Sequence, residues 1–199
     1  VAFHSPLVGR FNLENILCAA GAAAALEIAP ETVAEGIETF TSVPGRLERV
    51  ANTLERHVFV DFSHTPAALE NVLAALRRLG SGRLICIFGC GGDRDRTKRP
   101  LMGQIAGKYA DLAVVTSDNP RTEAPERIIE DIVAGMHHFT RVPPESLGVD
   151  FAPGTFAVEP DRRQAIHVGI RVSRPGDAIL IAGKGHETYQ IVGNTTVAF

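Results

Sequence analysis

The pattern of apolar and polar positions divides the chain into two parts. The sequence predicts a helix at 12–28, which Asn12 or Asn15 can cap and which continues as an alanine-rich run, and Pro30 opens a second helix. The turn-forming sequence SVPGR interrupts this pattern. Beyond it, short apolar runs alternate with amphipathic helical patterns. We therefore predict a boundary near residue 44, between a helical part at 1–44 and a second domain at 45–199.

The second domain is predicted to contain five strands and four helices, followed by a C-terminal hairpin. The predicted strands lie at 57–62, 83–89, 112–117, 156–160 and 178–183. The predicted helices lie at 66–79, 101–110, 124–139 and 161–173. Gly80 ends the first helix, Asp161 lies at the start of the last, and Gly193-Asn194 turns the hairpin. This alternation predicts an α/β fold with a mostly parallel sheet and helices on both faces.

The loops that follow the strands contain most of the glycine clusters and many unusual polar residues. In an open α/β sheet, ligands bind beyond the carboxyl ends of the strands. The loops are DFSHTP at 61–66, GCGGDRDRTKR at 89–99, SDNPR at 117–121 and GKGHE at 183–187. We therefore predict that they lie along one edge of the sheet and form the functional site.

The loop at 89–99 combines glycines with dense positive charge. Its glycines let a ligand approach backbone N–H groups, and its cations suit carboxylates or phosphates. Those cations are Arg94, Arg96, Lys98 and Arg99. The alternative is a solvated loop with internal Asp–Arg pairs. The loop is neither a Walker A sequence nor GxGxxG, so it gives little support for a dinucleotide site.

Two more loops offer side chains for binding. In SDNPR, Asn119 can hydrogen-bond a ligand and Arg121 can hold a carboxylate bidentately, while Pro120 stiffens the loop. A helix start capped by Asp118 or Asn119 is the alternative. In GKGHE, Glu187 can receive a substrate ammonium group, or it belongs to a tight turn with solvated charges.

The remaining polar candidates are more isolated. Asp61 ends a predicted strand and can accept hydrogen bonds from sugar hydroxyls, while Ser63 or Thr65 can cap the following helix. Arg46 lies at the domain boundary, where a solvated arginine is the simpler interpretation. The histidines show no metal-ligand spacing, so the sequence predicts no metal site.

Composition narrows the classes of function. The chain is 45% hydrophobic and carries a formal net charge of −3, so neither a nucleic-acid nor a membrane partner is expected. Three cysteines without a CxxC pair argue against a disulfide framework or a zinc ribbon, and a cytoplasmic location is expected. The chain begins with valine and ends on an apolar stretch, and we expect it to be a fragment of a longer protein.

Six stretches, taken in order, resemble the Mur ligase family over nearly the whole chain. They are GRFNLEN, VPGRLE, VDFSHTPAALENVL, FGCGGDRDRTKRPLM, SDNPRTE and AGKGHETYQIVGN. Within the family they are most similar to the ligases that add meso-diaminopimelate to UDP-MurNAc-L-Ala-D-Glu in peptidoglycan biosynthesis. One departure from the family pattern is Phe62-Ser63, where tyrosine and alanine are usual.

The resemblance implies a fold and a reaction. It assigns 1–44 to the tail of a central, ATP-binding domain and 45–199 to most of a Rossmann-like C-terminal domain that binds the amino acid. The implied reaction is amide formation through an acyl phosphate, with ATP and Mg²⁺ as cofactors. This sequence contains no P-loop, UDP-binding domain or modified, metal-supporting lysine of the family, so the chain alone is expected to be inactive.

The resemblance also implies site residues. Asn12 resembles the asparagine that contacts adenine, Arg46 the catalytic arginine that reaches the ATP phosphates, and Asp61 the aspartate on the ribose. The residues that match the meso-diaminopimelate site are Arg94, Asn119, Arg121, Gly183 and Glu187. Arg121 would hold the distal carboxylate that diaminopimelate has and lysine lacks, so rejection of lysine is expected.

The sequence leaves other functions open. One is a lysine-adding ligase, or another amide-forming relative such as a folylpolyglutamate synthase, although the pairing of DNPR with GKGHE speaks against both. Another is a stand-alone, non-catalytic ligand-binding module, which fits the missing P-loop. A nicotinamide-dependent dehydrogenase is disfavoured because its glycine fingerprint is absent.

Overall fold

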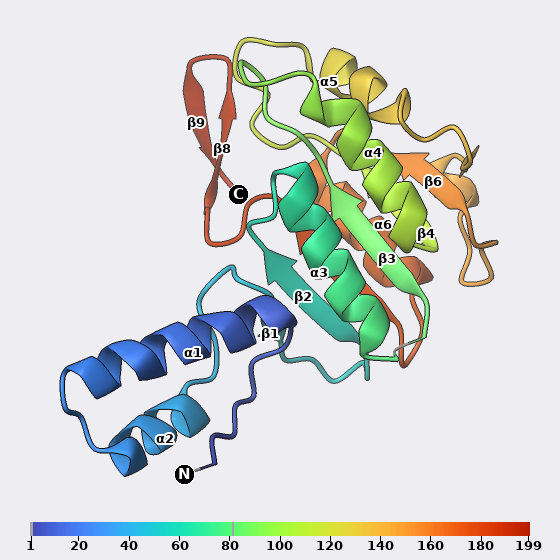
Figure 1. The fold of residues 1–199 in the computed structure, drawn as a ribbon. Helices are drawn as coiled ribbons and strands as arrows, with labels where there is room; N and C mark the ends of the chain where they lie inside the picture. The colour runs from blue at the N-terminus through green and yellow to red at the C-terminus, as the bar shows by residue number, and fades with distance from the viewer. Residues whose placement is uncertain (1, 81) are drawn as a thin grey trace. The chain divides into compact units, whose positions relative to one another are not determined.

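The structure of the chain is a computed structural model that describes residues 2–80 and 82–199. It separates into two compact units, Val1–Val43 and Pro44–Phe199, which are drawn in Figure 1. The division falls between Val43 and Pro44, at the turn-forming SVPGR sequence. In the described parts of the chain, no helix is both long enough and apolar enough to cross a membrane.

The first unit is a pair of helices, α1 (Arg10–Ala25) and α2 (Pro30–Thr39). Pro30 occupies the first turn of α2, where its missing N–H leaves no intrahelical bond unmade, and Glu31 is also in this turn. Most apolar side chains of α1 are exposed, with Leu13 at 56% and Leu17 at 59%. An amphipathic helix normally buries such a stripe, so these two helices do not form a closed core of their own.

The second unit is built on a seven-stranded sheet with the strand order β1-β2-β7-β3-β4-β6-β5. Its strands are β1 (Glu48–Val50), β2 (His57–Asp61), β3 (Leu84–Phe88), β4 (Leu112–Val115), β5 (Thr140–Arg141), β6 (Thr155–Val158) and β7 (Ala178–Ala182). All neighbouring pairs are parallel except β1 with β2, which is antiparallel. A hairpin of β8 (Tyr189–Val192) and β9 (Thr195–Ala198) ends the chain.

Helices cover both faces of the sheet, as the alternating pattern predicted (Figure 1). They are α3 (Pro66–Arg78), α4 (Lys98–Tyr109), α5 (Pro125–Val133) and α6 (Arg162–Val172), and a 3₁₀ turn, η1 (Pro144–Ser146), precedes β6. On the α6 face, Ile85 and Ile87 of β3 pack in one apolar cluster with Val168 of α6. The α/β fold with a mostly parallel sheet is therefore confirmed.

The structure differs from the predicted elements in a few places. The helix predicted at 124–139 ends at Val133, where the N–H groups of Gly135 and Met136 bond three residues back, to the Ile132 and Val133 carbonyls, and so tighten the last turn. The two edge strands β1 and β5 were not predicted. Both are short and mostly polar, and neither carries the apolar alternation by which a strand is recognised.

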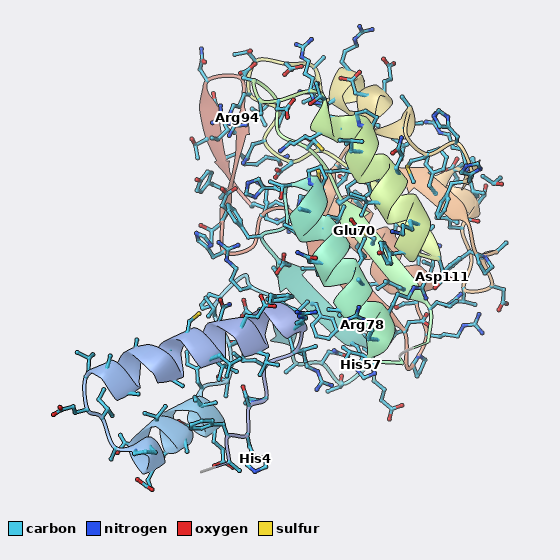
Figure 2. The ribbon with its side chains drawn as sticks, in the orientation of Figure 1. His4, His57, Glu70, Arg78, Arg94 and Asp111 are labelled. Carbon is cyan, nitrogen blue, oxygen red and sulfur yellow. The ribbon has the colours of Figure 1, made fainter. Side chains whose placement is uncertain are left out.

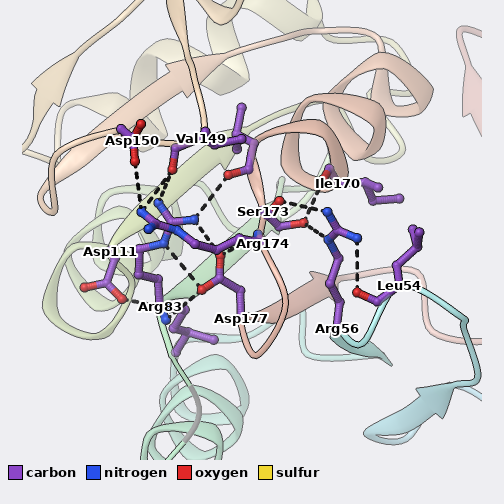
Figure 3. A network of polar contacts seen from close by, with 12 residues as sticks. Leu54, Arg56, Arg83, Asp111, Val149, Asp150, Ile170, Ser173, Arg174 and Asp177 are labelled. Carbon is purple, nitrogen blue, oxygen red and sulfur yellow. Dashed lines mark hydrogen bonds and ion pairs between the residues drawn. The ribbon is translucent and has the colours of Figure 1, made fainter.

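A polar network ties the amino ends of the central strands together (Figure 3). Asp177, just before β7, accepts hydrogen bonds from the backbone N–H groups of Arg83 and Arg174. It also forms an ion pair with the Arg83 guanidinium at 2.6 Å. On the same side, Arg56 donates to the Ser173 hydroxyl at 2.6 Å and to the Ser173 carbonyl at 2.9 Å. These contacts hold the loops at the amino ends of the strands in place.

Candidate functional site

The four strand-following loops meet at the carboxyl edge of the sheet and enclose a cavity of about 370 Å³. The five residues matched to an amino-acid site all line it: Arg94, Asn119, Arg121, Gly183 and Glu187. Figure 2 shows Arg94 at this end of the second unit and His57 at the opposite end. The cavity is also lined by Asp95, Lys98 and Asp118. Three cations and three carboxylates therefore surround it.

The four cations of the loop at 89–99 are of two kinds: some are held in ion pairs within the protein, and the others are available to a ligand. Arg99 is fully buried and forms ion pairs with Glu123 at 2.8 Å and Asp131 at 2.9 Å. Arg96 pairs with the same Glu123 at 2.9 Å. The hydrogen bond from Arg99, together with one from the Asp93 backbone, lowers the pKa of Glu123 to about 2. Two of the four cations are thus paired, but with carboxylates from outside the loop, so the alternative of Asp–Arg pairs within the loop is wrong for them.

The other two cations face the cavity. Lys98 donates to the His64 carbonyl at 2.7 Å and so joins the loop at 89–99 to the loop after β2. Arg94 is exposed and donates through Nη1 to the Asp93 carbonyl at 2.9 Å. In the described part of the chain it forms no ion pair. Arg94 is consequently the cation of this loop that is best placed to meet an anionic ligand.

Arg121 is presented by an unusual backbone conformation. Its φ of 52° lies in the left-handed region, which non-glycine residues seldom occupy. The β8–β9 hairpin holds this conformation, because Arg121 N–H donates to the Ile191 carbonyl and Gly193 N–H donates to the Arg121 carbonyl. Nη1 donates to the Gly92 carbonyl at 2.8 Å, whereas Nε and Nη2 bond no acceptor among the described residues. The guanidinium is therefore anchored at one end and available at the other.

Asn119 and Glu187 are joined across two loops. Asn119 Nδ2 donates to Glu187 Oε2 at 3.0 Å, and Asn119 Oδ1 accepts from Ile191 N–H. Asp118 and Asn119 do not cap α5, whose first turn begins with Pro125 and whose N-cap position is Ala124. The capping alternative is therefore wrong, and both side chains are directed to other partners.

Lys184 and Arg162 are buried cations that sequence reasoning did not assign. Lys184 is 3% exposed and lies 3.3 Å from Asp118 Oδ1. Arg162 is 2% exposed and donates to the Ala182 carbonyl at 2.7 Å. Burial lowers the pKa of each, and the Asp118 carboxylate opposes this shift. The only signal for Lys184 was its position between two glycines, and a single arginine in a helix gave none for Arg162.

Two of the residues matched to nucleotide binding, Asp61 and Arg46, belong to the second unit but are not among the residues that line the cavity. Asp61 is buried, and its two carboxylate oxygens accept from Leu47 N–H and Ser63 N–H at 2.7 Å each. Thr65, not Ser63, caps α3. Arg46 is exposed, and its guanidinium lies 4.9 Å from the centre of the Phe62 ring.

The turn that carries Arg46 is fixed against the GKGHE loop. Gly45 and Gly185 have positive φ angles of 69° and 51°. Gly45 carbonyl accepts from Phe62 N–H at 2.8 Å, and a Cβ on Gly185 would lie 2.7 Å from the Phe62 Cβ. Only glycine fits both the conformation and the space here. The position of Arg46 is thereby linked to the loop that carries Glu187.

Asn12 belongs to the first unit. It lies in the first turn of α1, and its Nδ2 donates to the Val8 carbonyl at 2.8 Å. In the described residues of both units, no group of three or more histidine, cysteine, aspartate or glutamate side chains is arranged to hold a metal ion.

Comparison with known proteins adds the family. Residues 45–185 match the profile of the Mur ligase, glutamate ligase domain. The chain belongs to the Mur ligase family. Among curated Mur ligases, it is 52% identical over 195 residues to the UDP-N-acetylmuramoyl-L-alanyl-D-glutamate–2,6-diaminopimelate ligase of Geobacter metallireducens, covering 97% of this chain and 38% of that protein. It is also 52% identical over its whole length to the ligase of the same name from Gloeobacter violaceus, again covering 38% of that protein.

Solved structures show the same fold. A UDP-N-acetylmuramoyl-L-alanyl-D-glutamate–2,6-diaminopimelate ligase matches all of this chain with a TM-score of 0.68 and 38% identity, and 38% of that chain is covered. Escherichia coli FolC in complex with ADP matches 92% of this chain with a TM-score of 0.64 at 21% identity, covering 38% of its own length. The chain spans about two fifths of the length of the curated relatives it matches.

Proposed function

We propose that this chain is the C-terminal part of an ATP-dependent ligase that adds meso-diaminopimelate to UDP-MurNAc-L-Ala-D-Glu in peptidoglycan biosynthesis. The observation that carries the proposal is the convergence of five residues from three loops on one cavity with balanced charge. Two curated relatives with 52% identity carry the name of this activity. The proposed site for the amino acid is the cavity at the carboxyl edge.

The charges of the cavity suit a ligand with two carboxylates and two ammonium groups. Arg94 and Arg121 each offer guanidinium nitrogens to a carboxylate, which such forks can bind bidentately. Glu187 has one oxygen hydrogen-bonded to Asn119, and its other oxygen can accept from an ammonium group. A diamino dicarboxylic acid therefore satisfies both signs of charge at once.

Selection against lysine follows from Arg121. Lysine has no second carboxylate, so it would leave the half-buried guanidinium without an anion in a closed site. Leaving a buried charged donor unpaired costs roughly 1–3 kcal/mol or more. A site built to bind a polar group rejects analogues that lack it far better than an apolar pocket rejects a smaller side chain. We assign the distal carboxylate of diaminopimelate to Arg121 on this basis.

The three residues proposed to bind the nucleotide have side chains whose chemistry suits that role. Asp61 offers about four acceptor positions, of which the two backbone N–H groups take two, so it retains capacity for ribose hydroxyls. Arg46 is exposed on a fixed turn and available for phosphate, and Asn12 has an amide of the kind that contacts adenine. ATP supplies the phosphoryl group that activates the substrate carboxylate as an acyl phosphate. Ligands for Mg²⁺ would come from phosphate oxygens and from residues outside this chain.

The proposal also assigns the two parts of the chain to two domains of the ligase. We assign 1–44 to the tail of the central ATP-binding domain and 45–199 to the C-terminal domain. The exposed leucines of α1 support this assignment, since a helix pair with an open apolar face fits a piece of a larger core. The relatives contain much more chain than is present here, so the chain alone is expected to be inactive.

The test is phosphate release by the full-length parent protein with ATP, Mg²⁺ and UDP-MurNAc-L-Ala-D-Glu. Meso-diaminopimelate and L-lysine are added in parallel reactions. Release that depends on diaminopimelate alone is the expected result. Phosphate release with lysine would still support a ligase activity, but it would reject the proposed role of Arg121. No release with either amino acid would favour a stand-alone binding module.

A further inference from the structure

Lys184 lies behind the cavity and not in its wall. Its Nζ donates to Asn119 Oδ1 at 2.9 Å and to the Tyr189 carbonyl at 2.7 Å, and it forms an ion pair with Asp118 Oδ1 at 3.3 Å. Two of its three N–H groups are thus used in hydrogen bonds, and the contact with Asp118 is an ion pair without a hydrogen bond among the described residues. Lys184 is therefore held by groups of the protein, and it is not among the residues that line the cavity.

The lysine determines how the Asn119 amide is oriented. Asn119 Oδ1 accepts from Lys184 Nζ and also from Ile191 N–H at 3.0 Å, which fills both lone pairs of the oxygen. Rotation of the amide by half a turn would bring its NH₂ group against these two donors. The buried ammonium thus requires that Nδ2 be the atom that meets Glu187.

The same lysine compensates the charge of two carboxylates. Its Nζ lies 3.7 Å from Glu187 Oε2, and Asp118 is only 7% exposed. The ammonium group therefore lies within ion-pair distance of both carboxylates. Glu187 has one oxygen held by Asn119, and its other oxygen is available to a ligand.

From this geometry, and resting on the proposed function, we propose that Lys184 is a positioning residue for the amino-acid substrate. It acts through Asn119 and Glu187. By fixing the amide with Nδ2 toward Glu187, it prepares that carboxylate to accept the ammonium group of an incoming zwitterionic amino acid.

The experiment uses Lys184→Met in the full-length parent protein, which retains the length of the side chain and removes its charge and donors. The KM for meso-diaminopimelate is expected to rise about 10- to 100-fold, as for the loss of a buried charged hydrogen-bond network. The KM for ATP is expected to change less than about threefold. Arg83→Met is the control, because it removes a mostly buried, ion-paired cation at the opposite edge of the sheet. It should lower the unfolding temperature without changing the KM for diaminopimelate.

A double-mutant cycle separates a positioning role from a general loss of structure. If Lys184 acts through Asn119, then Lys184→Met should raise the KM less than about threefold when Asn119→Ala is already present. Independent effects would instead multiply in the double variant, and this outcome would overturn the proposal.

A second variant keeps the proposal testable if Lys184→Met does not fold. Lys184→Gln retains donors for Asn119 and loses the charge, and it is expected to raise the KM for diaminopimelate about 3- to 10-fold. An unchanged KM in the folded variant overturns the proposal. The unaltered parent is assayed first, so an inactive parent rejects the proposed function, whereas an active parent with unchanged variants rejects only the role of Lys184.

Discussion

The two edges of the sheet both contain buried charges, but they use them differently. At the amino edge, all three guanidinium nitrogens of Arg83 donate to protein acceptors, and Asp177 accepts from two backbone N–H groups as well (Figure 3). At the carboxyl edge, Arg121 is anchored through Nη1 alone beside a cavity. A closed network of this kind stabilises the fold, whereas an incomplete one beside a cavity is suited to a ligand.

The difference has a physical origin in the chain topology. In an open α/β sheet, the loops beyond the carboxyl ends of the strands form the crevice in which ligands bind. The amino-edge carboxylate Asp177 is held charged by its partners: burial opposes its ionisation, but the hydrogen bonds from Arg83 and Arg174 lower its pKa below the ordinary value. Mutations at the two edges should therefore separate stability from substrate affinity.

The largest effect is expected from Asp177→Ala in the parent protein. This change leaves Arg83 and two N–H groups without their acceptor in a nearly buried site, and loss of one partner of such a pair costs about 3–5 kcal/mol. Thermal unfolding and hydrogen exchange of β7 peptides would measure the loss. The KM for diaminopimelate should stay within about twofold, and a large rise would show that the two edges are not independent.

Arg94→Ala should have the opposite signature. Its guanidinium is exposed and forms no ion pair within the described residues, so the unfolding temperature should hardly change. The KM for diaminopimelate should rise about 10-fold, at the lower end for a charge-assisted hydrogen bond in a partly hydrated site. Steady-state kinetics with ATP saturating would show this, and Arg96→Ala on the same loop is the matched control.

Glu123→Gln refines the comparison between the two edges. Glu123 lies at the carboxyl edge, but its charge is fully paired within the protein. The pKa of Glu123 is about 2, below its ordinary value of 4.5, so its stabilising effect is complete above pH 4.5 and is lost as the pH falls toward 2. The variant should therefore melt about 3–8 °C below the unaltered protein at pH 7. Melting curves recorded across this range should converge near pH 2, and a constant difference would contradict the assigned pKa.

Much of this architecture could be predicted from the sequence. The strands β2, β3, β4, β6 and β7 are apolar enough to be recognised, and the rule for parallel sheets placed their loops together. The edge strand β1 was missed because it has only three residues and pairs on one side, so it shows no clear alternation of apolar and polar positions. The early end of α5 was missed because apolar residues continue at helical spacing to Met136 and Phe139, beyond the last helical residue.

The site was predicted less completely than the fold. The loops and five lining residues were identified, but the division of the cationic loop into paired Arg96 and Arg99 and exposed Arg94 depends on Glu123, which comes from a different loop. The buried role of Lys184 likewise depends on Asn119, 65 residues away in sequence. The spacing of residues within one segment does not reveal partners from another segment. From the sequence alone, a buried lysine such as Lys184 therefore looks the same as a lysine exposed to solvent.

The most direct test of the central claim is the ratio of kcat/KM for meso-diaminopimelate to that for L-lysine, measured in the parent protein and in Arg121→Ala. Both residues have a Cβ and meet the same positive φ, so the substitution changes the guanidinium without adding backbone strain. We predict a strong preference for diaminopimelate that falls about 100-fold or more in the variant, while the KM for ATP is retained. An unchanged ratio would contradict the assignment of the carboxyl-edge cavity to a diamino dicarboxylic acid.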